Sequence, residues 1–122
     1  MKVKLTVKQR DYLSRLPEFD SASDLYWRKR FMDHIRVDPD ERKETINQLI
    51  KLAKLVKKPD GAYDWDDAFE TPKEYDLGKF ESYLKPALGV MSDHKRLHAC
   101  LLNLYFEYYP EELQELEKQT KE

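Results

Sequence analysis

The segment CLLNLYFEYYP, from Cys100 to Pro110, constrains the fold of this chain more than any other stretch. Eight of its eleven residues are Leu, Tyr, Phe or Cys, although 38% of the 122 residues in the whole chain are charged. A helix that is apolar around most of its circumference has to be covered by other elements on most sides. The segment therefore predicts a central helix over 93–109, with Ser92 as its N-cap, around which the other elements pack.

Apolar side chains recur at helical spacing in four further segments, which we interpret as amphipathic helices. The expected ranges are 7–16, 22–37, 40–57 and 77–85. The third is expected to begin with Asp38 as its N-cap and Pro39 at its first position, and its apolar residues Ile46, Leu49 and Ile50 lie on the face that is expected to be buried. Pro86 is expected to end or kink the fourth. The sequence thus predicts an all-α class of about five helices, forming a single compact domain over residues 1–122.

The N-terminus carries two competing local signals. Val3 and Leu5 alternate with lysines, a pattern of period two that is typical of a short strand. Such a strand needs a partner, and the sequence offers one only around 62–65. The alternative, which the sequence favours, is a helix that begins after Thr6, with Gln9 completing a capping box.

The single cysteine and the absence of long apolar segments limit the class of protein. Cys100 excludes a disulfide within the chain and a cysteine-based zinc site. Its apolar neighbours predict a buried, unreactive thiol. No segment has the length and apolar character of a secretory signal or a membrane helix. We therefore expect a soluble, cytoplasmic protein that makes no contact with a membrane.

Positive charge is concentrated in the first half of the chain. Residues 1–58 carry 15 Lys or Arg against 9 Asp or Glu, whereas residues 59–122 carry 7 against 15. Within the helix expected over 22–37, the stretch LYWRKRF combines aromatic residues with cations, a composition typical of nucleic-acid-binding surfaces. The pI of about 6.0 and the lack of a glycine-containing helix-turn-helix turn favour the alternative of a solvated helix face. The residues that would bind phosphates are Arg28, Lys29, Arg30 and Arg36.

The segment 59–76 is the first candidate for a partner-binding surface. It holds seven acidic residues and one lysine, interleaved with aromatic side chains, and its TPKE motif predicts a short helical turn near 72–75. Connections of this length are often functional. The alternative is a surface loop that Trp65 and Phe69 pin into the core. The expected contact residues are Tyr63, Asp64, Trp65, Asp66, Asp67 and Phe69.

The aromatic end of the predicted central helix is the second candidate. Tyr105, Tyr108 and Tyr109 are more rings than a domain of five helices readily buries, and Tyr favours sites where its ring is covered and its hydroxyl is wet. A two-fold interface would cover the same patch on two copies. We therefore expect a homodimer whose interface includes these tyrosines.

Histidines offer a weak signal for a metal site. His94 and His98 are four residues apart and would share one face of a helix, the spacing that lets two rings bind one metal ion. Asp93 or His34 would have to supply a third ligand, and the chain has no HExxH motif. We expect instead that His94 is exposed and that His98 packs beside Tyr105, with no metal and no cofactor.

Arg28 and His34 have the spacing R-x5-H within one expected helix. This spacing resembles that of the HEPN ribonucleases, helical proteins whose Arg and His cut RNA at a dimer cleft. The resemblance covers these two residues, and Lys29 stands where those enzymes usually carry a polar residue. It implies RNA cleavage by this pair. The alternative is that Arg28 is a surface charge whose aliphatic part covers apolar neighbours.

Taken together, the sequence favours a non-catalytic interaction module whose partner is another protein. Nucleic-acid binding is the first alternative, and a HEPN-like or metal-dependent enzyme is the second. No residue is predicted to be catalytic. A small, cysteine-poor chain rich in Lys, Glu and Tyr looks like the accessory or modulator proteins of bacteria and their phages.

Overall fold

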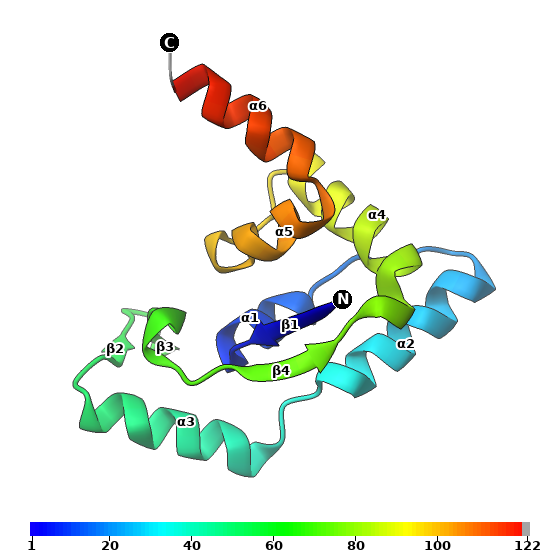
Figure 1. Ribbon diagram of the computed structural model, residues 1–122. Coiled ribbons are helices and arrows are strands. Elements are labelled where there is room, and N and C mark those ends of the chain that lie inside the picture. The colour runs from blue at the N-terminus through cyan, green and yellow to red at the C-terminus, as the bar shows by residue number, and fades with distance from the viewer. Residues whose placement is uncertain (121–122) are drawn as a thin grey trace.

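The structure is a computed structural model that describes residues 1–120, so the last two residues of the predicted domain lie outside it (Figure 1). Most of these residues are helical, in rough agreement with the predicted all-α class, and two short two-stranded sheets are also present. The helices are α1 (Val7–Leu13), α2 (Ala22–Ile35), α3 (Pro39–Lys51), α4 (Glu81–Asp93), α5 (Leu102–Tyr108) and α6 (Pro110–Thr120). The strands are β1 (Lys2–Leu5), β2 (Val56–Lys57), β3 (Tyr63–Asp64) and β4 (Lys73–Asp76), and the 3-10 turns are η1 (Asp67–Phe69), η2 (Gly78–Phe80) and η3 (Ala99–Leu101). None of the helices in this range is long and apolar enough to span a bilayer.

Both N-terminal signals are confirmed, because the strand and the helix follow one another. β1 is the strand, and Thr6 caps α1 with Gln9 in a complete capping box. The strand's partner differs from the expected 62–65: β1 pairs with β4 in an antiparallel register. The helical turn expected near 72–75 is therefore wrong. With an extended backbone, residues 73–76 provide the hydrogen-bond partners of β1 and bury the Tyr75 side chain.

The single helix predicted over 93–109 is confirmed only in part, because α5 covers Leu102–Tyr108 of this range, and the central helix is instead α4. α4 continues through Pro86, which was expected to end or kink it, and runs to Asp93. The chain then turns at Lys95, which adopts a left-handed backbone with φ of 57°, and restarts as η3 and α5. α4 sends more side chains into the core than any other helix among residues 1–120; they are Tyr83, Leu84, Ala87, Leu88 and Met91.

The first three helices end earlier than their apolar patterns predict. α1 ends at Leu13 and α2 at Ile35. α3 begins as expected, with Asp38 as N-cap and Pro39 in its first turn, but it ends at Lys51 instead of continuing to 57. Its buried side chain is Leu49.

The predicted burial of Ile50 is also wrong, because this side chain is 57% exposed. α3 touches the rest of the protein along a narrow stripe, and its neighbour in sequence, Leu49, occupies that stripe with 1% exposure. Two residues that are adjacent in a helix point about 100° apart, so both cannot lie on a narrow buried stripe.

A buried guanidinium joins the first three helices. Arg10 of α1 is 2% exposed and donates two hydrogen bonds to the Glu41 carboxylate of α3, at 2.7 and 2.9 Å. Two further N–H groups donate to the carbonyl oxygens of Ile35 and Arg36 at the end of α2, at 2.8 and 2.6 Å. Because each of the three guanidinium nitrogens donates a hydrogen bond, this charge is held inside the fold and links the end of α2 to the start of α3.

Candidate functional site

The segment 59–76 is folded, and it begins with a small hairpin formed by β2 and β3. Pro59 and Asp60 occupy the turn, which is closed by the Gly61 N–H donating to the Lys58 carbonyl oxygen at 3.0 Å. Gly61 has φ of 87°, a left-handed conformation that glycine adopts without a steric cost. The turn chemistry of PDG thus brings Tyr63 back alongside Lys57.

Glu70 anchors this segment to the body of the protein. Its carboxylate accepts hydrogen bonds from the backbone N–H groups of Val7 and Lys8 at the start of α1, at 2.8 and 3.1 Å. It also accepts from the indole N–H of Trp65 at 2.8 Å. A carboxylate at a helix N-terminus satisfies donors that have no partner within the helix. The segment is therefore held in one position although it lies far from α1 in sequence.

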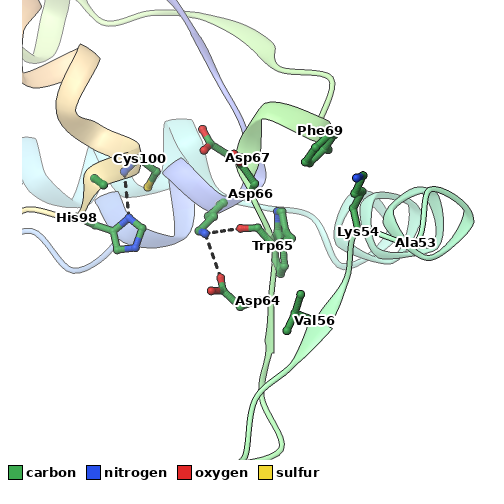
Figure 2. A pocket seen from close by; sticks show the side chains of 12 residues that line it. Ala53, Lys54, Val56, Asp64, Trp65, Asp66, Asp67, Phe69, His98 and Cys100 are labelled. Atoms are coloured by element: carbon green, nitrogen blue, oxygen red, sulfur yellow. Dashed lines mark hydrogen bonds and ion pairs between the residues drawn. The ribbon is translucent and has the colours of Figure 1, made fainter.

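A solvent-open pocket of about 640 Å³ lies between this segment, the end of α3 and η3. Figure 2 shows Val56, Trp65 and Phe69 on the side of the pocket nearest α3, with His98 and Cys100 on the opposite side. Of the six residues predicted for partner binding in 59–76, five line this pocket. They are Asp64, Trp65, Asp66, Asp67 and Phe69.

The apolar side chains of this region are exposed. Val56 is 61% exposed, Tyr63 is 54% and Phe69 is 43%. The Lys54 ammonium lies 4.6 Å from the centre of the Phe69 ring, close enough for a cation–π interaction. The alternative in which Trp65 and Phe69 pin a loop into the core is therefore wrong for Phe69, whereas Trp65 is half-buried.

Lys8 of α1 also lines the pocket. Its ammonium forms an ion pair with Asp64 at 3.0 Å and donates to the carbonyl oxygen of Trp65. Burial disfavours the charged ammonium, but the hydrogen bond and attraction to Asp64 outweigh this, and the pKa of Lys8 rises above its ordinary value. The same hydrogen bond lowers the pKa of Asp64. Both groups therefore stay charged at neutral pH and orient β3.

The His98 ring is held by two neighbouring groups, and the Cys100 thiol is protonated at neutral pH. The Nδ1 atom of His98 accepts a hydrogen bond from the Cys100 N–H at 3.1 Å, and its ring stacks on Tyr12 at 3.8 Å between centres. The expected packing of His98 against Tyr105 is therefore wrong. Burial lowers the pKa of His98, and burial raises the pKa of the Cys100 thiol to about 11. Since thiolate is the nucleophilic form, Cys100 is not an activated nucleophile at neutral pH.

The tyrosines of the second predicted surface are covered by the chain itself. Tyr105 and Tyr108 are 4% and 7% exposed. Tyr105 donates to Glu112 of α6 at 2.5 Å and stacks on Tyr109, whose hydroxyl donates to the carbonyl oxygen of Lys85 in α4. The ground for expecting a homodimer here, too little cover for these rings, is thus wrong. α6 and α4 supply the cover, and the oligomeric state itself stays a prediction.

Two of the four basic residues predicted for nucleic-acid binding are hydrogen-bonded to groups of the chain itself. Arg28 turns inward and donates to the Leu16 carbonyl oxygen at 3.2 Å, while Arg30 donates to the hydroxyl of Tyr26 at 2.9 Å. Lys29 and Arg36 are exposed, and Arg36 lies after the end of α2. Arg10, another cation of this half, is buried.

Arg28 and His34, the two residues of the R-x5-H spacing, contact different neighbours. The Arg28 guanidinium holds the connection between α1 and α2. The His34 ring packs against Tyr75 and Phe80, and its Nε2 atom lies 3.2 Å from the Asp76 carbonyl oxygen. The structure therefore does not bring Arg28 and His34 together as a pair. Among residues 1–120, no three His, Cys, Asp or Glu side chains are placed to share a metal ion.

The sequence pattern missed three residues that shape the site. Lys8 and Lys54 belong to the basic half of the chain and gave no local signal, and Glu70 was one of many acidic residues. Each acts through a partner that is distant in sequence or on another element, such as the start of α1 for Glu70. No family model, curated protein or solved structure matches this chain.

Proposed function

We propose that this protein is a non-catalytic interaction module that binds a protein partner through the surface formed by β2, β3 and η1. One observation carries the proposal: Tyr63 and Phe69 are held out in solvent on a segment that Glu70 and Lys8 tie to the body. Exposing apolar rings costs free energy in a monomer, and aromatic residues are enriched at the centres of interfaces.

The partner's chemistry follows from what surrounds these rings. Asp60 and Asp66 are exposed beside them, and Asp64 and Asp67 are half-exposed along the pocket. A partner that matches this surface inserts an apolar side chain beside Phe69 and presents cations to the carboxylates. A cytoplasmic accessory or modulator role is the corresponding proposal at the level of the cell.

Paired variants test the proposal. The double substitution Tyr63→Ser with Phe69→Ser removes the exposed rings, and Leu25→Ser with Tyr26→Ser removes two side chains of comparable exposure, 44% and 53%, elsewhere on the surface. We expect affinity capture from nuclease-treated extract of the source cell to recover a protein with the parent and the control, but not with the site variant. Recovery of the same proteins by all three variants would contradict the proposal.

We propose the homodimer separately, with an interface that involves α6 instead of Tyr105 and Tyr108. Figure 1 shows α6 projecting away from the body, and its apolar side chains Leu113 and Leu116 are exposed. They are three residues apart and therefore share one helix face. Light scattering at tens of micromolar decides between the monomer mass of 14.7 kDa and its double. Leu116→Ser should restore the monomer mass if the doubled mass is found.

A further inference from the structure

The sheet of β1 and β4 has an edge whose backbone groups point outward. The two strands are antiparallel, with Val3 opposite Tyr75, and just beyond them the Leu77 N–H donates to the Met1 carbonyl oxygen at 2.8 Å. Hydrogen-bonded and non-hydrogen-bonded pairs alternate along an antiparallel ladder. The N–H and C=O groups of Val3 and Leu5 therefore point toward β4, as the C=O group of Met1 does. The N–H and C=O groups of Lys2 and Lys4 point away from β4.

These outward groups have no hydrogen-bond partner within the part of the chain that the structure describes. The next N–H that points away from β4 is that of Thr6, and it already donates to the Gln9 side chain at 2.9 Å. On the opposite edge of the sheet, the Asp76 carbonyl oxygen faces the His34 ring at 3.2 Å. The open part of this edge therefore consists of the N–H and C=O groups of Lys2 and Lys4, and it ends at Thr6.

A groove of about 270 Å³ runs along this open edge. One wall is β1 itself, and the other is α5, which contributes Asn103, Leu104 and Glu107; Figure 1 shows α5 on the side of β1 that faces away from β4. Gln9 closes one end and is fixed by donating to the Cys100 carbonyl oxygen at 2.9 Å. An edge strand beside a helix is a geometry in which extended peptides add as a further strand.

Charge selects the kind of chain that fits this edge. On the solvent face of the sheet Lys2 lies opposite Asp76 and Lys4 lies opposite Glu74. A second copy of β1 would place lysines beside lysines, and like charges on adjacent strands are destabilising. A strand with Asp or Glu at alternate positions would instead continue the order of opposite charges across the sheet.

We propose that the outer edge of β1 binds an extended acidic peptide of a partner protein as a third strand, in the groove between β1 and α5. Backbone hydrogen bonds from Lys2 and Lys4 hold the peptide, and the lysine side chains select its carboxylates. This surface is separate from that of Tyr63 and Phe69, and the inference stands whether or not the proposed function holds.

Lys4→Pro tests the backbone contact directly. Proline removes the outward N–H, which the β1–β4 ladder does not use, and edge strands accept proline at such positions. Lys4→Thr is the matched control, since it removes the charge and keeps the N–H. The probe is a display library of random peptides about 12 residues long, selected on the full-length parent protein. Circular dichroism checks that both variants keep the parent fold.

We expect the selected peptides to carry Asp or Glu at alternate positions. Their affinity should fall about ten-fold or more with Lys4→Pro and clearly less with Lys4→Thr. It should be unchanged by Tyr63→Ser with Phe69→Ser. Should Lys4→Pro fail to fold, N-methylating alternate residues of a selected peptide asks the same question: one methylation register should abolish binding and the other should leave it.

Three results would overturn the proposal. The first is that no peptide is enriched over the bare support. The second is that Lys4→Pro binds the selected peptides as tightly as the parent protein does, or that the parent protein binds both N-methylated forms as tightly as the unmethylated peptide. The third is a doubled mass of the parent that Lys4→Pro returns to the monomer value, because the edge would then be occupied by a second copy.

Discussion

At the scale of single residues, the pairing of Arg10 with Glu41 is the least exposed ion pair among residues 1–120. Arg10 is almost fully buried, and Glu41 supplies both of its carboxylate oxygens. Removing one partner of a buried pair leaves a charge without compensation, which costs far more than the pair contributes relative to an apolar substitute. Arg10 thereby links α1 to the end of α2 and to the start of α3.

Glu41→Gln should therefore lower the free energy of unfolding by about 2 kcal/mol at pH 7. The hydrogen bond from Arg10 lowers the pKa of Glu41 below its ordinary 4.5. The stabilisation is accordingly complete above about pH 4.5 and is lost as the pH falls through the lower pKa of the folded state. Urea unfolding of parent and variant at pH 7 and pH 3 measures this. A difference that does not shrink at pH 3 would contradict the assignment.

At the scale of elements, the helix ends decide the layout of the binding surface. α3 ends in a Schellman motif, in which the Lys54 N–H donates to the Leu49 carbonyl oxygen at 2.9 Å and Ala53 adopts φ of 55°. α4 ends in the same way around Lys95. Because α3 ends early, Val56 belongs to the hairpin that carries Tyr63.

The narrow contact stripe of α3 gives a paired prediction. Leu49→Ala should lower the free energy of unfolding by about 2–4 kcal/mol, because it empties a fully buried site. Ile50→Asp, one residue further along, should cost about 1 kcal/mol or less, because that side chain is exposed. Thermal melting followed by circular dichroism compares the two variants. A larger loss with Ile50→Asp than with Leu49→Ala would show that the stripe has been placed on the wrong face.

At the scale of the whole molecule, the tyrosines of α5 belong to the core, where α4, α5 and α6 meet. The hydroxyl of Tyr108 is buried without a hydrogen-bond partner among the described residues, and burial raises its pKa to about 12. An unsatisfied buried hydroxyl costs free energy that a matching apolar ring does not.

Tyr108→Phe should therefore raise the free energy of unfolding by about 1 kcal/mol, equivalent to roughly 3–5 °C in melting temperature. Tyr108→Glu should lower it by several kcal/mol and reduce the helical signal, because a carboxylate would enter the core. Calorimetry and circular dichroism measure both effects. If Tyr108→Glu kept the helical signal and changed only the molecular mass, Tyr108 would lie at an interface between copies.

The sequence by itself determined the features that rest on contacts between near neighbours. The capping box of Thr6 and Gln9 and the Asp38 cap are each completed within a few residues, so their residue types were sufficient to place them. The acidic, aromatic character of 59–76 was visible for the same reason, and most of its predicted residues do line one pocket.

Only the tertiary structure decided the features that depend on distant partners. Residues 73–76 form a strand because β1, some 70 positions earlier, supplies the ladder that a local capping box cannot match. α4 passes through Pro86 because Ala87 and Leu88 beyond it are fully buried, and their packing offsets one lost backbone hydrogen bond. Ala53 and Lys95 take left-handed conformations without the glycine that normally announces a helix end. Arg10 is buried because Glu41 and two carbonyl oxygens converge on it from other helices, which no pattern within α1 can reveal.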